Sequence, residues 1–122
     1  MTEPRLKTEI RIAAHVRRAQ GAGAFATIAR RGDPDAGAVA VKVYLGAGRS
    51  RVLVQSRDLD GRSIWRDPLA GGAGVDAPPE GGPPADHQEA EVDAWLARET
   101  AIDPDLWIVE IEDREGRAFL ED

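Results

Sequence analysis

The two histidines are the side chains in this 122-residue sequence best suited to general acid–base chemistry. A hydrolytic triad needs a nucleophile, a histidine base and an orienting acid. Neither His15 nor His87 lies beside a serine-bearing nucleophile motif. Cysteine is absent, which excludes disulfides, thiolate nucleophiles and sulfur-ligated zinc together. We therefore predict that the chain has no catalytic residue.

Metal and cofactor sites are equally poorly supported. His87 and Glu91 have the i, i+4 spacing of a helical metal-binding pair, but solvated charge explains them better. The glycines between residues 71 and 82 lack the strand–loop–helix context and the Lys-Ser/Thr ending of a phosphate-binding loop. Glu110, Glu112 and Asp113 could act as acid and base partners if a buried strand face raised a carboxyl pKa by desolvation, but one such carboxylate is not a catalytic site. We predict no metal and no cofactor.

The charged segment Arg30–Gly37 has two interpretations. Its aspartates can accept hydrogen bonds from backbone amides while its proline fixes φ, so the segment can simply close a hairpin. Alternatively, its charged side chains form a cluster at a sheet end that binds carboxylate or phosphate, since arginine makes bidentate contacts to both. The candidate binding residues of this cluster are Arg30, Arg31, Asp33 and Asp35.

A basic helix face is the second candidate surface. At 100° per residue, four basic residues fall on one side of a helix, opposite Leu6 and Ile10: Lys7, Arg11, His15 and Arg18. A helix that binds a membrane surface or nucleic acid would have bulky aromatic residues along this seam, and this helix has none. We interpret it as a solvated face, with contact to DNA or RNA through Lys7, Arg11 and Arg18 as a weaker alternative.

Charge is divided along the chain. Residues 1–66 contain 13 basic and 6 acidic residues, whereas residues 67–122 contain 3 and 16, within a formal net charge of −6. Such an asymmetry fits a basic surface for nucleic acid or an acidic partner. It fits better two halves that neutralise each other within one domain, because a pI near 4.9 is far from the basic values of nucleic-acid binders.

The first half of the chain reads as one helix followed by strands. Apolar spacing after a proline predicts a helix from Pro4 to Gln20. Ala24–Arg31 and Ala38–Leu45 read as two strands of a hairpin, and alternation in the second predicts an antiparallel sheet. Arg51–Ser56 and the short piece Ser63–Trp65 follow as further strands.

The second half begins with a loop. Residues 67–85 hold five Gly and five Pro, typical of a loop insertion or a disordered segment. Asp86 and Glu89 have capping-box spacing for a helix that runs to about Glu99. Leu106–Glu112 reads as a central, largely buried strand, and Arg117–Leu120 as its return in an edge hairpin around Gly116. We expect at least two of the three tryptophans to be buried.

These elements predict a single α+β domain over residues 1–122. It has an antiparallel or mixed sheet of five to six strands with two helices packed on it, in the order α-β-β-β-(β)-α-β-β. No run approaches the roughly 18 apolar residues of a membrane span, and the N-terminus lacks an apolar signal region. We expect a soluble, cytoplasmic protein with no membrane contact.

The order of these elements and three segments resemble a known family. The segments are Pro4–Ile10, Arg30–Gly37 and Asp103–Arg117. Together they are similar to the bacterial, alphaproteobacterial domain-of-unknown-function family numbered 1491. The resemblance covers nearly the whole chain except residues 67–85, a segment longer than that family leads us to expect. It implies no activity, since the family has none assigned.

With few and scattered reactive groups, the sequence favours a non-catalytic protein-interaction or regulatory module that works through its surface. The alternative is a small hydrolase or ligand-binding enzyme with a charged site among Arg31, Asp33, Lys42 and Glu110. Nucleic-acid contact through the N-terminal helix is a third and weaker reading. The identity of the partner is open at this point.

Overall fold

The computed structural model describes residues 7–57, 60, 63–70 and 84–120, which contain two helices and six strands. The helices are α1 (Thr8–Gly21) and α2 (Glu89–Ile102). The strands are β1 (Phe25–Arg30), β2 (Val39–Gly46), β3 (Arg49–Arg57), β4 (Ser63–Arg66), the two-residue β5 (His87–Gln88) and β6 (Trp107–Glu112). The predicted α+β class, with two helices on a mixed sheet, is confirmed.

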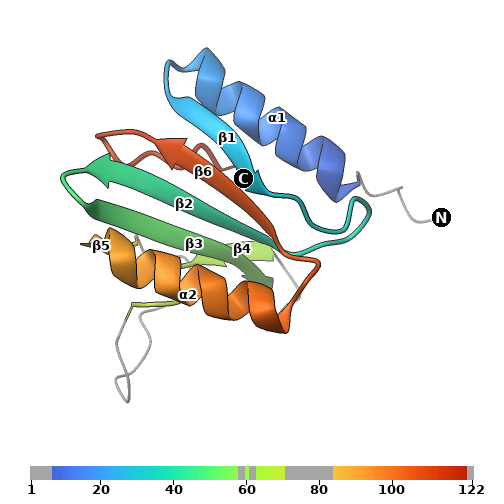
Figure 1. Cartoon of the computed structure of the whole chain (residues 1–122). Helices are drawn as coiled ribbons and strands as arrows, with labels where there is room; N and C mark the ends of the chain where they lie inside the picture. The colour runs from blue at the N-terminus through green and yellow to red at the C-terminus, as the bar shows by residue number, and fades with distance from the viewer. Residues whose placement is uncertain (1–6, 58–59, 61–62, 71–83, 121–122) are drawn as a thin grey trace.

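The sheet has the order β1-β6-β2-β3-β4, with β5 paired to β3 (Figure 1). Strand β6 runs antiparallel to β1 and parallel to β2. The predicted hairpin between residues 24–31 and 38–45 is therefore wrong, because β6 separates the two strands. Strand β2 does pair with β3, and β3 with β4, as sequential neighbours. Both β2 and β6 are largely buried, which is the property of strands in the middle of a sheet.

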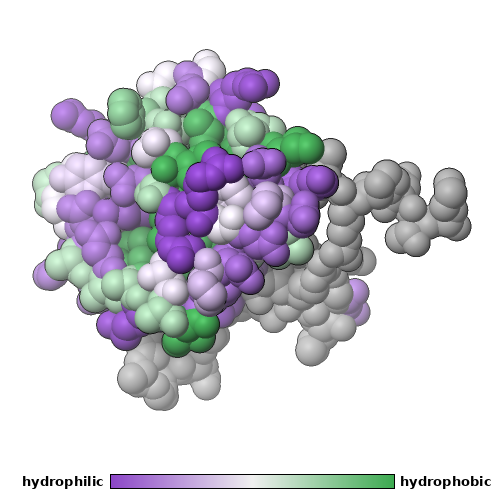
Figure 2. Space-filling model, turned by 45° about the vertical axis from the view of Figure 1, so that its right-hand side comes forward, coloured by the Kyte–Doolittle hydropathy of each residue, from purple (hydrophilic) through white to green (hydrophobic). Residues whose placement is uncertain are grey.

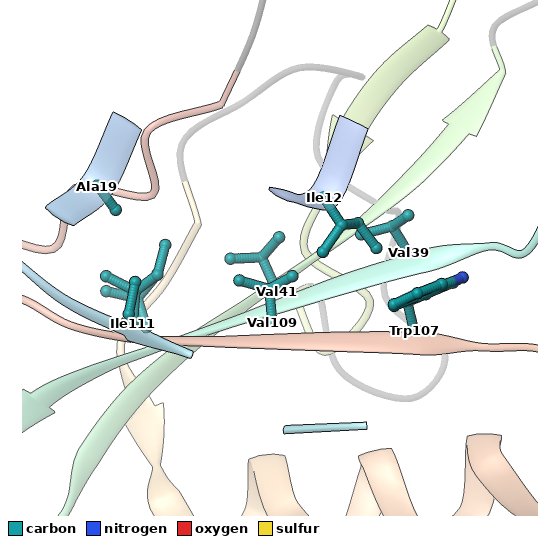
Figure 3. Packing of buried hydrophobic residues seen from close by; sticks show 9 residues of the cluster. Ile12, Ala19, Val39, Val41, Trp107, Val109 and Ile111 are labelled. Carbon is teal, nitrogen blue, oxygen red and sulfur yellow. The ribbon is translucent and has the colours of Figure 1, made fainter. Parts of the chain in front are cut away.

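The two helices pack on opposite faces of the sheet (Figure 1), which we name the α1 face and the α2 face. The alternation of β2 and β6 divides their side chains between the faces. The α1 face is a cluster of Ile12, Ala19, Ala26, Val39, Val41, Val43, Trp107, Val109 and Ile111 (Figure 3). The α2 face is a cluster of Ala40, Val52, Val92, Leu96, Leu106 and Ile108. The predicted central position of Leu106–Glu112 is confirmed.

Helix α1 is rotated relative to the sequence-based expectation. It buries Thr8, Ile12, His15 and Ala19, whereas Ile10 is 50 % exposed. Leu6, the other residue of the predicted apolar stripe, lies outside the described residues. The two polar groups can be buried because both are hydrogen-bonded: Thr8 Oγ1 donates to Asp35 O, and His15 Nε2 lies 2.6 Å from Ala118 O. The side predicted to be solvated is thus partly turned towards the sheet.

Four details of the second half differ from the prediction. Helix α2 begins at Glu89, and its N-cap Gln88 makes no side-chain cap bond; the Asp86 carboxylate accepts from Arg51 instead. The helix extends three residues further, to Ile102. Gly116 takes the positive φ expected of the turn, but residues 117–120 form no strand, and residues 118–120 pack against the α1-face cluster. Only Trp107 is buried; Trp65 and Trp95 are half-buried.

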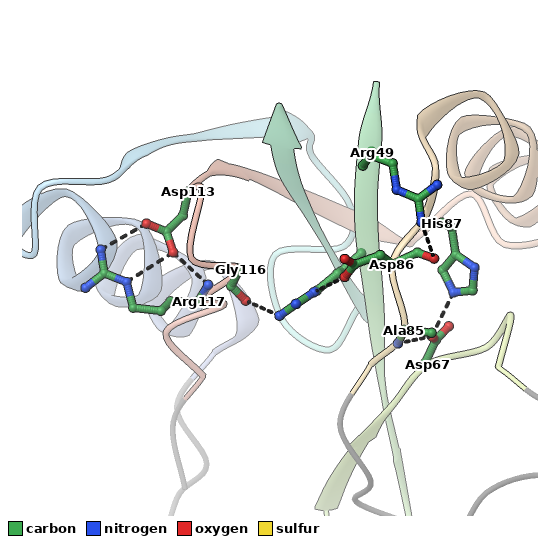
Figure 4. Close-up of polar contacts among 9 residues, drawn as sticks. Arg49, Asp67, Ala85, Asp86, His87, Asp113, Gly116 and Arg117 are labelled. Carbon is green, nitrogen blue, oxygen red and sulfur yellow. Dashed lines mark hydrogen bonds and ion pairs between the residues drawn. The ribbon is translucent and has the colours of Figure 1, made fainter. Parts of the chain in front are cut away.

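The Gly/Pro-rich segment is closed at its base by Asp67. The buried carboxylate accepts a hydrogen bond from Leu69 N at 2.8 Å. It also accepts one from Ala85 N at 3.0 Å and lies 2.8 Å from His87 Nε2 (Figure 4). These contacts bring the two ends of the segment together next to β5. Residues 71–83, the rest of the predicted insertion, lie outside the described residues. In the described part of the chain, no helix has the length and apolar character needed to cross a membrane.

Candidate functional site

The turn at residues 31–37 ties the start of α1 to the start of β6. The backbone amides of Thr8 and Glu9 donate to Asp35 O and Pro34 O, at 3.4 and 3.0 Å. On its other side, Asp33 N donates to Asp105 O at 3.0 Å. The turn therefore joins two distant segments instead of closing a hairpin between neighbouring strands, and it occupies amides at the N-terminus of α1.

The charged side chains of this turn have internal partners. One Arg30 Nη donates to Pro104 O at 2.9 Å and to Leu106 O at 2.6 Å. Arg31 pairs with Glu9 at 2.8 Å, and its guanidinium lies 5.1 Å from the Trp107 ring centroid. Asp33 Oδ1 accepts from Asp35 N, and Lys7 pairs with Asp35 at 3.5 Å. Binding of an external carboxylate or phosphate by Arg30, Arg31, Asp33 and Asp35 stays a prediction, and it would compete with these contacts.

Two glycines allow the turn to approach Trp107. The indole Nε1 donates to Asp33 O at 2.7 Å. A Cβ on Gly32 would overlap Asp105 O and lie 2.7 Å from Trp107 Cδ1, and a Cβ on Gly37 would do nearly the same. Only glycine fits at such a close backbone approach. This explains why the sequence places glycine, aspartate and arginine together here.

The basic residues of α1 that the sequence suggested for nucleic-acid contact also make contacts within the chain. Arg11 Nη2 donates to Gln55 Oε1 at 3.2 Å. Arg18 donates to Phe119 O through Nε and Nη2, at 3.2 and 3.0 Å. With His15, these residues fasten α1 to β3 and to the segment after β6. Their use in binding nucleic acid stays a prediction, against which these contacts would compete.

Lys42 is buried on the α2 face beneath three carboxylates. Its Nζ, on a side chain only 5 % exposed, donates to Glu89 at 2.8 Å and Asp93 at 2.7 Å, and it lies 3.8 Å from Glu110. Burial alone would lower the pKa of Lys42. The hydrogen bonds to Asp93 and Glu89 outweigh burial and raise that pKa above its ordinary 10.5. The ammonium therefore stays charged and holds the carboxylates of α2 and β6 together.

The four residues of the predicted enzyme site fall into two groups. Lys42 and Glu110 are neighbours in the register of β2 and β6 and lie on the α2 face. Arg31 and Asp33 instead contact Trp107, whose side chain belongs to the α1 face. The alternation of β6 places Glu110 and Trp107 on opposite faces of the sheet. No single site combines all four.

The outer part of the α2 face, on β1 and β6, is exposed. In the register, Phe25 lies opposite Glu112 and Thr27 opposite Glu110, so these four side chains share a face. Phe25 is 68 % exposed, and Thr27 and Glu112 are also exposed. Glu89 and Asp93 border this area through their contacts with Lys42. We name it the open face, defined by Phe25, Thr27, Glu89, Asp93, Glu110 and Glu112.

Sequence reasoning did not find the open face because it assigned β1 the wrong neighbour. Phe25 and Thr27 alternate along one strand, and Glu110 and Glu112 along another, and only the pairing of β1 with β6 brings them together. The available signal was the two carboxylates on an otherwise apolar strand. A strand buried on both faces would not carry them.

A serine, a histidine and an aspartate also meet at β5, without the geometry of a triad. Ser50 lies opposite His87 in the register, and His87 contacts Asp67. However, Ser50 is fully buried, and its Oγ has no hydrogen-bond partner among the described residues. The other ring nitrogen of His87 lies 3.5 Å from Glu91. Since both ring nitrogens face carboxylates, the imidazole is not placed to activate the serine. Among the described residues, no group of three potential ligands could hold a metal ion.

The turn after β6 provides a test of pH dependence. Asp113 accepts hydrogen bonds from Arg117 Nε, Nη2 and backbone N at 2.7–3.0 Å (Figure 4), and those bonds hold the pKa of Asp113 below its ordinary 3.8. A lowered carboxyl pKa stabilises the fold above the unfolded value, and the effect is lost as the pH falls through the folded value. We expect Asp113→Asn to lower Tm by a few degrees at pH 7 and by much less near pH 2.5, measured by thermal denaturation. Asp105→Asn, the same change at an exposed position, is the control, and an equal Tm loss at both pH values would contradict the expectation.

The structure is that of an α+β protein with a helix on each face of a mixed sheet. Its charged turn contains two glycines and packs against a buried tryptophan. The model of the family "Protein of unknown function (DUF1491)" matches residues 6–121, and the chain belongs to this family. The resemblance inferred from the sequence is thereby confirmed.

Solved structures of family members are similar over almost the whole chain. A crystal structure of a DUF1491 family protein from Caulobacter crescentus CB15 is 42 % identical, with a TM-score of 0.78 and 97 % of each chain covered. An NMR structure of a DUF1491 family protein from the same bacterium is 40 % identical, with a TM-score of 0.75, and 98 % and 96 % of the chains are covered. The solution structure of protein Atu0922 from A. tumefaciens is 30 % identical, with a TM-score of 0.68 and coverage of 96 % and 93 %. The search of the curated proteins gave no match.

Proposed function

We propose that this protein is a cytoplasmic, non-catalytic interaction module whose open face binds a basic segment of a partner protein. The observation that carries the proposal is the exposure of Phe25 beside a set of carboxylates that have few basic neighbours. A chain without cysteine is compatible with a reducing compartment. The internal contacts of the turn and of α1 favour the open face over the other candidate surfaces.

Phe25 supplies the apolar part of the open face. An aromatic side chain at 68 % exposure gives up much of the free energy that burial would provide, about 25 cal/mol per Å² of apolar surface. Aromatic residues are common at the centres of protein interfaces, where a partner restores that burial. Elsewhere, on the side of the molecule seen in Figure 2, apolar residues form small patches separated by hydrophilic ones. An isolated aromatic suits a short peptide segment better than a broad protein surface.

The charge of the open face determines the kind of partner. Glu89, Asp93, Glu110 and Glu112 carry four negative charges, and Lys42 offsets one of them. Lys42 lies beneath three of these carboxylates and holds them in place. Its positive charge does not offset the negative charge of Glu112. A negative potential attracts lysine and arginine side chains and repels phosphates. The open face therefore favours a basic peptide over nucleic acid.

The test is an NMR titration of the isotope-labelled protein with a synthetic ten-residue peptide of alternating Lys and Leu. We expect resonance shifts centred on Phe25, Thr27 and Glu112, and binding that weakens with added salt. A peptide with Glu in place of Lys, and a single-stranded oligonucleotide, should leave these resonances unchanged. Shifts that map elsewhere, or equal binding of the acidic peptide, would refute the proposal.

Two variants with matched controls separate specific binding from general charge effects. Phe25→Ser and Glu112→Lys should each weaken peptide binding about tenfold, a change of about 1.4 kcal/mol. Ile102→Ser removes an apolar side chain that is 77 % exposed at the end of α2, and Glu115→Lys reverses an exposed charge beyond β6. Both controls should bind as the original chain does. Equal losses in variants and controls would show that the open face is not the binding surface.

A further inference from the structure

A second site lies at the other end of α2, away from the open face. There a partly enclosed cavity of about 170 Å³ opens between the last turns of α2 and the ends of several strands. Its lining includes Val54, Arg66, Trp95, Glu99, Asp103 and Leu106. An apolar cavity of roughly 150 Å³ can hold benzene, so the space suits a ligand of about that size.

The cavity is negatively charged on its helical side. Glu99 and Asp103 come from the C-terminal turn and the C-cap of α2, where the helix dipole adds partial negative charge. The last turn of α2 has no basic residue to offset it. One oxygen of Asp103 accepts a hydrogen bond from Asp105 N, which fixes the carboxylate in position. This side of the cavity suits a small cation such as an ammonium.

Arg66 contributes the opposite charge from the sheet. Its register partner on β3 is Val54, so both side chains lie on the α2 face with Trp95 and Glu99. No ion pair joins Arg66 to Glu99 or Asp103, although all three line the same space. Arginine pairs well with carboxylates, so an opposed but unjoined arginine leaves room for a ligand carboxylate.

Apolar groups also line the cavity. The half-buried indole of Trp95 lines the cavity together with Val54 and Leu106. A ligand that crosses the cavity would place a short hydrocarbon portion against these side chains, and its cation could also face the indole ring. The lining thus combines apolar side chains with two carboxylates from α2 and one guanidinium from β4.

We propose that this cavity binds a small zwitterion of amino-acid size, with its ammonium at Glu99 and Asp103 and its carboxylate at Arg66. A simple cation would use only the helical side and leave Arg66 unused, and a simple anion would face two carboxylates. The proposal does not depend on the open face, because no residue is shared between the two sites. Either one can fail without the other.

The test compares three molecules with the same hydrocarbon group: L-valine, isobutylamine, which lacks its carboxylate, and isovalerate, which lacks its ammonium. Titrations are followed by the indole N–H resonances of the isotope-labelled protein. We expect valine to shift the Trp95 resonance saturably and to bind at least tenfold more tightly than either analogue. The Trp107 indole, which is buried and bonded to Asp33, serves as an internal reference.

Charge-removing variants identify the two ends of the site. Arg66→Gln should abolish the preference for valine over isobutylamine, and Glu99→Gln the preference for valine over isovalerate. Arg98→Gln and Glu91→Gln remove the same charges at exposed positions of α2 outside the cavity and should change neither preference. The proposal is overturned if valine leaves Trp95 unshifted at tens of millimolar, if isobutylamine binds as tightly as valine, or if both cavity variants bind valine unchanged.

Discussion

Replacing Trp107 with alanine is expected to lower the free energy of unfolding by about 4 kcal/mol, in the middle of the range for a buried aromatic. The side chain is fully buried in the α1-face cluster, and its indole holds the turn at Asp33. Its removal leaves a cavity and also frees the turn that caps α1. Urea denaturation followed by far-UV circular dichroism measures the change. Trp65→Ala, at a half-buried position, should cost less, and an equal loss would contradict this role for Trp107.

Two further variants separate the volume of Trp107 from its hydrogen bond. Trp107→Phe keeps most of the apolar volume but leaves Asp33 O without its indole donor, so we expect a loss of about 1 kcal/mol. Gly32→Ala keeps the indole but forces a Cβ against Asp105 O and the ring. We expect its cost to exceed that of Trp107→Phe, because the obstacle includes backbone that cannot move freely. A tolerated Gly32→Ala would show that the close packing of the turn is unimportant.

Replacing Lys42 with methionine is expected to cost about 2 kcal/mol at pH 7. Removing one member of a fully buried ion pair costs about 3–5 kcal/mol, but here the remaining carboxylates are 37–53 % exposed and keep part of their hydration. Since the pKa of Lys42 is raised, its contribution is complete below the ordinary 10.5 and is lost only as the pH rises through the folded value. Urea denaturation at pH 7 measures the loss.

The origin of this cost is repulsion among Glu89, Asp93 and Glu110 once the ammonium is removed. Asp93→Asn leaves Lys42 with two carboxylates and should cost less than about 1 kcal/mol. In the Lys42→Met background the same change should raise stability, because it removes one of the repelling charges. A Lys42→Met variant as stable as the original chain would show that packing, and not charge, holds this cluster.

Most helices and strands could be predicted from the sequence, because each depends on residues close together in the chain. Alternation placed Val109 and Ile111 on one face of a buried strand, and the helical spacing of Val92 and Leu96 marked the buried side of α2. The family resemblance lay in segments that the structure shows to be fastened to one another, around Gly32, Asp33 and Trp107.

Pairing between distant segments could not be read in the same way. Nothing in the alternation of residues 24–31 distinguishes a hairpin with residues 38–45 from an antiparallel contact with β6. The buried side of α1 was predicted wrongly because it includes two polar residues, Thr8 and His15. Their burial is favourable only because they form hydrogen bonds with loops distant in the sequence. For the same reason the open face and the cavity, each built from several elements, were not predicted.

The place of β6 between β1 and β2 has a consequence for how the protein is made. While a ribosome is still synthesising residues up to about 105, the first strand has no neighbour on which to pair, and α1 has only part of its packing surface. The sheet becomes continuous only when the stretch from Trp107 to Glu112 is inserted between β1 and β2, so its closure must wait until that stretch has been synthesised. Such late closure makes folding slower, since contacts distant in sequence must form together, and it leaves unfinished chains exposed to aggregation and proteolysis.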